Sequence, residues 1–328
     1  MRHAIIMAAG KGTRMHSSLP KVMHRIVEKP MIGHLIDTLK TLDVDKIVSI
    51  VGYGHEIITR AYEGQCEFAL QEPQLGTGHA VMQAKCLEGL EGQTLVINGD
   101  CPCIKKETFD RMFQELDKGA AMVVLSTRLD DPKAYGRVIF NNEGIIERIV
   151  EFKDCNEDQK KVEYINTGIY AFDNKVLFDC LPLLTNDNQQ QEYYITDLVE
   201  IISKKGLQVR ALVTEDTDEV QGINDKVELA YANRYMQKRI NEEWMRKGVN
   251  IVDPSNTYIG ADVTFDEDVV VYPDVYIYGD SHIGKGCVIR PNSYLDNVTL
   301  HDGCVVDASR ITNLTIDSKS VIGPFEKL

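Results

Sequence analysis

A six-residue period in the last quarter of the chain constrains the fold more than any other feature. Seven apolar residues recur at steps of six, namely Ile259, Phe265, Val271, Ile277, Ile283, Ile289 and Leu295. Such a period is typical of a hexapeptide β-helix, in which each coil buries one apolar residue per side and neighbouring coils cover it. An ordinary antiparallel β domain is the alternative, but seven residues in register disfavour it. The sequence therefore predicts a short left-handed parallel β-helix over residues 249–328.

The register weakens after the seventh repeat. The step falls to five at Leu300 and the spacing is irregular until Val321-Ile322-Gly323, where a further coil begins. A solenoid usually ends in a capping element, and none is visible before Leu328. We therefore expect either a shortened chain or an end that partner chains cover.

Upstream of the repeat, β-type runs alternate with amphipathic stretches as far as about residue 224. The expected strands are Ala4–Met7, Lys46–Val51, Glu67–Leu70, Thr94–Ile97 and Ala121–Ser126. The expected helices are Met31–Leu42, Glu56–Glu63, His79–Leu87 and Thr108–Lys118. This alternation predicts an α/β domain over residues 1–225 with a doubly wound, Rossmann-like and mostly parallel sheet, whose ligands lie beyond the carboxyl ends of the strands.

A single helix is expected between the two regions, over residues 226–248. Its apolar residues are spaced three or four apart, as on one face of an amphipathic helix. They are Leu229, Ala232, Met236, Ile240 and Trp244.

Charge and composition limit the classes of partner. The 328 residues include 36 Lys and Arg against 50 Asp and Glu, a net charge of −14. Proteins that coat nucleic acid or anionic membranes need a basic surface, so neither partner is expected. The apolar run Ala4–Ala9 is too short for a signal segment or a membrane span. The eight cysteines lack C-x-x-C spacing, which favours reduced thiols in a cytoplasmic protein.

A glycine-containing loop with basic side chains follows the first expected strand. It reads Gly10-Lys11-Gly12-Thr13-Arg14-Met15, with Pro20-Lys21 shortly after. Glycines let the backbone approach phosphate oxygens, and the basic side chains add positive charge. Met15 replaces the third glycine of a dinucleotide fingerprint and the P-loop pattern also fails, so a dehydrogenase or a P-loop ATPase is disfavoured. By itself the G-x-G pattern fits a tight turn equally well.

The loop is the first of several motifs in a fixed order. The others are Gln71 with Leu75-Gly76-Thr77-Gly78-His79-Ala80, then Gly99-Asp100, Tyr135-Gly136-Arg137, Glu151-Phe152-Lys153-Asp154, Ile165-Asn166-Thr167-Gly168, Glu192-Tyr193-Tyr194-Ile195-Thr196-Asp197 and Gly222-Ile223-Asn224. With the hexapeptide tail, this set resembles the sugar-nucleotide pyrophosphorylases. Within them it is most similar to the uridylyltransferase half of the bacterial bifunctional enzymes that make UDP-N-acetylglucosamine. The resemblance covers essentially the whole chain.

The resemblance implies a reaction and its cofactor. A phosphate oxygen of N-acetylglucosamine 1-phosphate would attack the α-phosphorus of UTP and release pyrophosphate, which supplies precursor for peptidoglycan and lipopolysaccharide. Asp100 and Asn224 would bind Mg²⁺, a hard cation that completes its shell with water and phosphate oxygens. Because the attacking group is already an anion, no general base is required. Catalysis would rest on alignment and on the positive charge of Lys11, Arg14 and Lys21.

The same resemblance implies a set of substrate contacts. Gln71 and Gly76 would bind uracil, with Thr77 beside them. Lys11 and Arg14 would hold the phosphates that leave, and Lys21 would hold the α-phosphate and the sugar phosphate. The backbone flanking the nucleoside would be Met7, Ala8, Ala9 and Gly10. The residues that bind the sugar would be Gly136, Glu151 and Asn166, with Asn98 and Gly99 preceding the metal carboxylate. Glu151 would accept hydrogen bonds from ring hydroxyls, and Asn166 would address the N-acetyl group or a neighbouring hydroxyl.

Two features depart from the family pattern. The family usually has tyrosine where this chain has Asn98. That change matters little if the position acts through its backbone, and alters affinity or sugar choice if the tyrosine ring packs on the sugar. Cys101 and Cys103 follow the metal carboxylate, and we expect them to be buried structural thiols rather than ligands of a soft metal.

Other functions stay open at this stage. Another sugar-1-phosphate nucleotidyltransferase, using glucose 1-phosphate or dTTP, is the nearer alternative, and a non-catalytic regulatory relative is the more distant one. The family's acetyltransferase residues lie in later coils, so no acetyl transfer is expected from these residues. The family also forms homotrimers through its β-helix, and a shortened β-helix would weaken that assembly.

Overall fold

The computed structural model describes the whole chain, residues 1–328, as two compact units. The first comprises Met1–His24 and Met31–Glu228, and the second comprises Arg25–Pro30 and Leu229–Leu328. The hairpin of β2 (Arg25–Ile26) and β3 (Lys29–Pro30) therefore belongs to the second unit, although the residues on either side of it belong to the first. None of the helices combines the length and the apolar character needed to cross a membrane.

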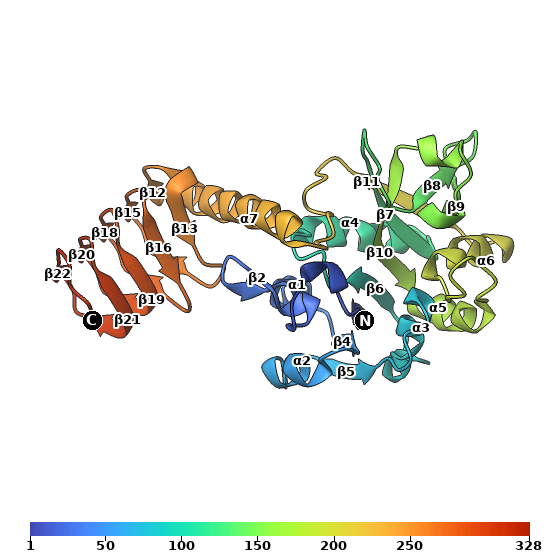
Figure 1. Cartoon of the computed structure of the whole chain (residues 1–328), viewed down its shortest axis with the longest axis horizontal. Helices are drawn as coiled ribbons and strands as arrows, with labels where there is room; N and C mark the ends of the chain where they lie inside the picture. Colours follow the sequence, from blue (N-terminus) through green and yellow to red (C-terminus); the bar gives the residue numbers. More distant parts are fainter. The chain divides into compact units, whose positions relative to one another are not determined.

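A nine-stranded sheet forms the centre of the first unit (Figure 1). Its order is β11-β7-β10-β6-β1-β4-β5, with β8 and β9 beside β10. The strands are β1 (Arg2–Ala8), β4 (Lys46–Val51), β5 (Glu67–Leu70), β6 (Gln93–Asn98), β7 (Met122–Arg128), β8 (Arg137–Phe140), β9 (Ile146–Val150), β10 (Tyr164–Asp173) and β11 (Val209–Thr214). Strands β4, β5 and β6 continue the parallel direction of β1, whereas β10 runs antiparallel to both β6 and β7. This topology confirms the predicted mostly parallel α/β sheet.

Helices cover both faces of this sheet. They are α1 (Met31–Lys40), α2 (His55–Ala61), α3 (Thr77–Met82), α4 (Lys106–Asp117), α5 (Asn174–Cys180) and α6 (Leu198–Lys204). Side chains alternate across a strand, so Ala4 and Ile6 of β1 pack in one apolar cluster with α1 and α4. Ile5 points the other way, into a second cluster with α3, α5 and α6. Burial on both faces explains why these strands are almost entirely apolar.

The bounds of the predicted elements agree with the structure to within two residues, with one exception. The helix predicted over His79–Leu87 is wrong, because α3 begins earlier and ends at Met82, and a separate 3-10 turn covers Lys85–Leu87. Contacts from a distant segment hold the start of α3. The Gly78 N–H donates to the Tyr193 carbonyl at 2.7 Å, and the Thr77 hydroxyl accepts from the Ile195 N–H at 3.1 Å.

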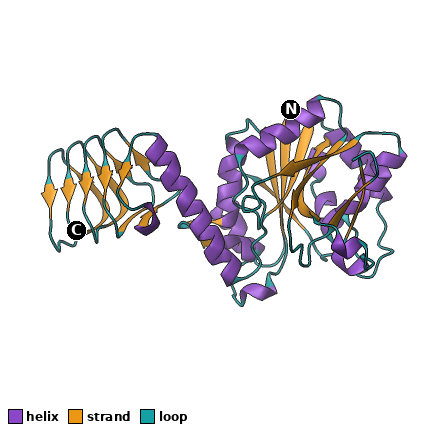
Figure 2. Ribbon diagram, turned by 90° about the horizontal axis from the view of Figure 1, so that it is seen from above, coloured by secondary structure: helices purple, strands orange, loops and turns teal.

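Parallel strands of the second unit stack in successive coils, drawn as orange arrows in Figure 2. One sheet has the order β12-β15-β18-β20-β22, and the other has the order β13-β16-β19-β17-β14 with β21 beside β19. The strands are β12 (Asn250–Ile251), β13 (Thr257–Ile259), β14 (Thr264–Phe265), β15 (Val270–Val271), β16 (Val275–Tyr278), β17 (His282–Ile283), β18 (Val288–Ile289), β19 (Tyr294–Leu300), β20 (Val305–Val306), β21 (Arg310–Ile316) and β22 (Val321–Ile322). All seven residues of the six-residue period are buried in one cluster, which confirms the predicted β-helix.

The irregular spacing after Leu295 is a shortening of the coils. Val271, Ile289, Val306 and Ile322 are consecutive partners in one sheet, and they are 18, 17 and 16 residues apart. All four remain buried, so the later coils are shorter in the segments between their inward-facing residues. A search for a strict period of six loses the repeat here, although the coils continue.

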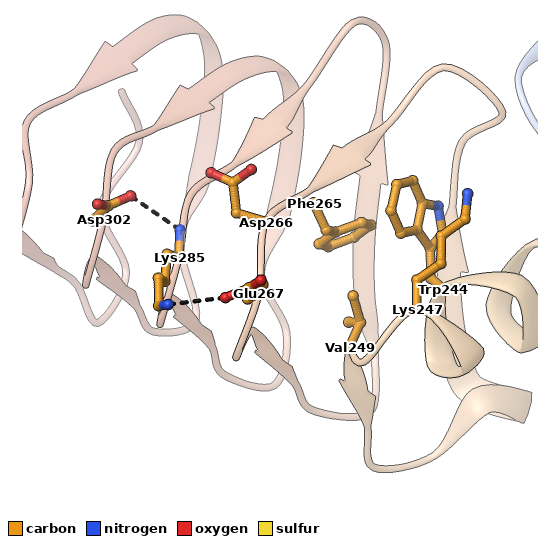
Figure 3. Close-up of a pocket in the computed structure, with 8 residues that line it drawn as sticks. All are labelled: Trp244, Lys247, Val249, Phe265, Asp266, Glu267, Lys285 and Asp302. Atoms are coloured by element: carbon orange, nitrogen blue, oxygen red, sulfur yellow. Dashed lines mark hydrogen bonds and ion pairs between the residues drawn. The ribbon is translucent and has the colours of Figure 1, made fainter.

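The helix α7 (Lys226–Arg246) confirms the predicted connecting helix. Within the second unit its later part packs on the β-helix: Ile240 and Trp244 contact the apolar cluster. The rings of Trp244 and Phe265 meet edge to face with their centres 5.1 Å apart. Figure 3 shows the two side chains next to each other. Nearby, the Lys285 ammonium donates a hydrogen bond to the Glu267 carboxylate, and the Lys285 backbone N–H donates one to the Asp302 carboxylate. The ring contact joins the end of α7 to the first coil, and the Lys285 hydrogen bonds join successive coils to one another.

Candidate active site

A cavity of about 240 Å³ opens at the carboxyl ends of β1 and β6. Met7 and Asn98 are register partners at the ends of these two neighbouring strands. Eight of the predicted site residues line the cavity: Met7, Thr77, Asn98, Asp100, Gly136, Glu151, Asn166 and Asn224. They come from segments spread over more than two hundred residues, and the sheet brings them to one edge, as expected for a doubly wound fold.

The two predicted metal ligands and two of the predicted cations meet at one end of this cavity. Lys21 forms an ion pair with the Asp100 carboxylate. The amide oxygen of Asn224 accepts from the Lys21 ammonium at 2.8 Å and from the Arg14 guanidinium at 2.8 Å. The Asp100 carbonyl accepts from the Ile223 N–H at 2.9 Å, which ties the loop before Asn224 to the end of β6.

The donor chemistry of this cluster fits a magnesium ion. The Asn224 side-chain N–H donates to the Gly222 carbonyl at 3.2 Å, which leaves its amide oxygen to the cluster. Asp100 and Asn224 thus offer two hard oxygen donors. No group of three or more acidic, histidine or cysteine side chains in the structure could hold a metal ion. A two-ligand site suits Mg²⁺, which keeps several waters and takes oxygens from substrate phosphates.

The glycine loop packs against Lys21. Gly12 has a φ of +60°, and a Cβ there would lie 2.6 Å from the Lys21 Cβ, so glycine is required for both conformation and space. Arg14 is part of the short 3-10 turn Thr13–Met15, whose Met15 is buried. Lys11 does not join Asp100 and Asn224. Its ammonium lies 5.6 Å from the centre of the Tyr53 ring instead.

The residues predicted to bind uracil form a second group. The Gln71 side-chain N–H donates to the Gly76 carbonyl at 3.0 Å and lies 3.2 Å from His79 Nδ1. Gly76 has a φ of +107°, and a Cβ there would lie 2.6 Å from the Tyr193 carbonyl oxygen. The side-chain amide oxygen of Gln71 has no hydrogen-bond partner in the chain, so it remains available as an acceptor for a base.

The ends of β1 and β6 support the loops on either side of the cavity. The Gly99 N–H donates to the Met7 carbonyl at 2.9 Å, and Ala8 is buried at the end of β1. The Ala9 carbonyl accepts a hydrogen bond from the side chain of Gln74. Gly10 differs from the other glycines of the site because a Cβ there would contact no atom within 4 Å.

The residues predicted to bind the sugar lie side by side. A Cβ on Gly136 would lie 3.3 Å from a Glu151 carboxylate oxygen and 3.5 Å from the Asn166 Cβ. Burial is the largest cause that raises the pKa of Glu151, and the nearby Asp154 and Asp197 add to it, while a 3.5 Å hydrogen bond from Thr196 opposes it. Glu151 is therefore a mostly buried acceptor beside a surface that glycine leaves open.

Comparison with known proteins matches both parts of the chain to families. Residues 3–245 match the nucleotidyl transferase family, and residues 262–297 match the bacterial transferase hexapeptide family. The bifunctional protein GlmU of Halalkalibacterium halodurans is 42% identical over 329 residues, covering 100% of this chain and 72% of that protein. The GlmU of Listeria monocytogenes is 44% identical with the same coverage, and that of Geobacillus thermodenitrificans is 47% identical over 90% of this chain and 65% of its own. The chain belongs to the GlmU family.

A solved structure also shares the fold of this GlmU-family chain. It is a Bacillus anthracis protein described as a glucose-1-phosphate thymidylyltransferase in complex with sucrose. The TM-score is 0.57 at 23% identity, and the match covers 71% of this chain and 94% of that one. At this identity the likeness concerns the fold alone.

Sequence reasoning assigned no role to several residues that line the cavity of this GlmU-family chain. They are Ala134, Tyr135, Thr167, Gly168, Tyr170, Ile195, Thr196 and Gly222. Most belong to the ordered motifs, so the motifs themselves were the signal that could have found them. Burial raises the pKa of Tyr135 to about 12, so its hydroxyl stays a donor at neutral pH.

A buried arginine supports the Tyr135-Gly136 turn of this GlmU-family chain. Arg137 is 2% exposed, and its guanidinium donates to the carbonyls of Lys133, at 3.0 Å, and Tyr135. It also lies 5.4 Å from the centre of the Phe152 ring. These contacts fix the loop that presents Tyr135 and Gly136 to the cavity.

Cys101 and Cys103, which follow Asp100, are both buried, at 1% exposure. The Cys101 thiol donates to Asp100 at 3.5 Å, and burial is the largest cause that raises its pKa well above the usual value. None of the eight cysteines forms a disulfide. A protonated, buried thiol agrees with the structural role expected for Cys101.

Proposed function

We propose that this GlmU-family chain transfers UMP from UTP to N-acetylglucosamine 1-phosphate and releases pyrophosphate. The observation that carries the proposal is the meeting of Lys21 and Arg14 on Asn224, with Lys21 also paired to Asp100. It supports a site for a polyphosphate and its metal ion at the carboxyl edge of the sheet. The adjoining Gly136, Glu151 and Asn166 support a sugar site next to it.

Asp100 and Asn224 would hold Mg²⁺, which when bound neutralises phosphate charge and helps to align the reacting groups. Around it, Lys21 would stabilise charge on the α-phosphate and on the sugar phosphate. Arg14 and Lys11 would hold the two phosphates that leave. For Lys11 this requires its ammonium to leave the Tyr53 ring, an exchange that the stronger attraction of a triphosphate favours.

The transfer needs no residue that accepts a proton. A sugar-phosphate oxygen forms the new bond to the α-phosphorus, and the bond from that phosphorus to the oxygen bridging to the β-phosphate breaks. The negative charge leaves with pyrophosphate. The protein's contribution is alignment and charge stabilisation by fixed cations, which typically supplies most of the acceleration of a phosphoryl-type transfer.

The remaining predicted residues have matching places in this proposal. Gln71 would offer its unpaired carbonyl oxygen to the uracil N–H, beside Gly76 and Thr77. Glu151 would accept hydrogen bonds from sugar hydroxyls. We further propose that residues 1–225 form the catalytic domain, joined by residues 226–248 to a β-helix over 249–328 that assembles as a homotrimer.

The test is pyrophosphate release from UTP and N-acetylglucosamine 1-phosphate, with Mg²⁺ and with a chelator. We expect release that depends on the metal and is faster with the N-acetylated sugar than with glucose 1-phosphate. Faster release with dTTP than with UTP, or with glucose 1-phosphate than with its acetylated analogue, would place the chain in another branch of nucleotidyltransferases. No release with any pair of substrates would refute the proposal.

A further inference from the structure

Asn98 presents an uncommitted amide at the cavity. It is the last residue of β6 and lines the cavity two residues before Asp100. Its backbone carbonyl accepts from the Cys101 N–H at 3.1 Å, but its side chain makes no hydrogen bond with the chain. Asn98 is partly exposed, and neither polar atom of its side chain is among the buried polar atoms that lack a partner, so both are open to solvent. Both the donor and the acceptor of the Asn98 amide are therefore available to a ligand.

The Asn98 amide occupies space that is free because residue 168 is a glycine. A Cβ on Gly168 would lie 2.0 Å from Asn98 Nδ2 and 2.9 Å from its Cγ. Gly168 has a φ of +75°, and it lies where the pairing of β10 with β7 shifts between Asn166 and Tyr170. The absent side chain and the bulge together admit the Asn98 amide at the wall of the cavity.

The side-chain amide of Asn166, unlike that of Asn98, is hydrogen-bonded within the chain. Its oxygen accepts from the Gly168 N–H at 3.2 Å and from the Tyr170 hydroxyl at 3.0 Å, and its NH₂ group lies 2.8 Å from the same hydroxyl. Asn166 is also 9% exposed, compared with the intermediate exposure of Asn98. Asn166 thus holds the backbone at the bulge around Gly168 while it also lines the cavity, whereas the side-chain amide of Asn98 has no partner in the chain.

The neighbours of Asn98 indicate which group its amide can recognise. Its register partner on β1 is Met7, a partly exposed apolar residue that also lines the cavity. Glu151, which also lines the cavity, can only accept hydrogen bonds when it is ionised, which suits hydroxyl groups. An amide N–H beside an apolar thioether suits a carbonyl oxygen with an attached methyl. On a sugar 1-phosphate, the acetamido group is the group with that chemistry.

We propose that Asn98 determines sugar specificity, because its Nδ2 donates a hydrogen bond to the carbonyl oxygen of the 2-acetamido group while Met7 contacts the methyl. This inference rests on the proposed function, since it concerns the same sugar site. It assigns recognition of the acetamido group to Asn98 and leaves Asn166, whose amide oxygen is bonded to Gly168 and Tyr170, to a neighbouring sugar hydroxyl.

The test compares two sugars in steady-state kinetics of Asn98→Ala. We expect kcat/KM for N-acetylglucosamine 1-phosphate to fall about tenfold, as for the loss of one hydrogen bond to a buried acceptor. The value for glucose 1-phosphate should change less than about twofold, and so should KM for UTP. Asn98→Asp, which keeps the shape but loses the donor, should show the same loss of preference. The exposed Asn142→Ala is the matched control.

Binding of UDP-N-acetylglucosamine and UDP-glucose, measured by calorimetry, provides a readout that does not need turnover. We expect Asn98→Ala to weaken only the acetylated ligand. Equal losses for both sugars, or an unchanged preference, would overturn the role of Asn98. So would a loss of preference in Asn166→Ala alone. If the unsubstituted chain turns over neither sugar, the proposed function fails, a result distinct from any of these.

Discussion

The Lys21 ammonium is paired with the Asp100 carboxylate at the carboxyl end of the central sheet, and both side chains are largely buried, at 14% and 20% exposure. An ion pair shielded from water is electrostatically strong, and it leaves a fixed positive charge beside the carboxylate. A phosphate that enters this place meets that charge without any rearrangement of solvent. The pair therefore joins the proposed metal site to the proposed phosphate site.

Lys21→Ala tests the catalytic part of this link. Removing the ammonium should lower kcat/KM for pyrophosphate release by about a hundredfold or more, as for the loss of a preorganised charge at a transferring phosphate. Lys175→Ala, at an exposed lysine on α5 without a partner, is the matched control and should leave the rate unchanged. A Lys21→Ala variant that keeps more than about a tenth of the activity would contradict the assigned role.

Asp100→Ala tests the metal site. The substitution removes one of two oxygen donors, so turnover should be abolished at ordinary Mg²⁺ concentrations. The fold should be retained, because the Asp100 contacts that hold the Ile223 loop are made by its backbone carbonyl. Circular dichroism and thermal unfolding check the fold, and pyrophosphate release checks activity. Near-normal turnover in Mg²⁺ would show that Asp100 does not hold the ion.

Gly76→Ala tests the conformation of the segment that is proposed to bind uracil. The substitution places a Cβ 2.6 Å from the Tyr193 carbonyl oxygen at a φ of +107°, so it combines a backbone clash with an unfavourable conformation. We expect a loss of about 2 kcal/mol or more in the free energy of unfolding. Gly10→Ala is the matched comparison, because a Cβ there contacts no atom within 4 Å. Equal stability of the two variants in urea titrations would contradict this interpretation.

Asp197→Asn tests the pH dependence of stability. Burial, with like charge from Glu200 and Asp154, raises the pKa of Asp197 from 3.8 to about 6. Because the folded state then binds the proton more tightly, the stability from Asp197 is complete below about pH 4 and is lost as the pH rises through about 6. Asparagine does not titrate, so the variant should melt a few degrees higher than the unsubstituted chain near pH 7.5 and show no such gain near pH 4.

The control for this pH dependence is Asp187→Asn, at an exposed aspartate without a partner. Its melting temperature should follow that of the unsubstituted chain at both pH values. If the Asp197→Asn gain is the same near pH 4 as near pH 7.5, the effect comes from packing rather than from the carboxylate charge.

Much of the fold could be predicted because its signals are local. The β-helix repeats an inward apolar residue every six positions, and the strands β4 and β5 have the bounds that the sequence predicts. The prediction failed where non-local forces act. The start of α3 depends on the backbone of Tyr193 and Ile195, and the later coils lose residues between inward positions, which a fixed period cannot follow.

By itself, the sequence determined the fold class, because periodicity is a property of the chain, and its ordered motifs predicted the residues of the site. Only the tertiary structure decided which of those residues lie together. Lys21 meets Asn224 across 203 positions, and Lys11 lies on Tyr53 instead. The roles of Asn98 and Asn166 also separate only in space, because a hydrogen bond depends on what each amide finds around it. Distance, burial and unpaired polar groups arise from packing, which no local pattern of residues specifies.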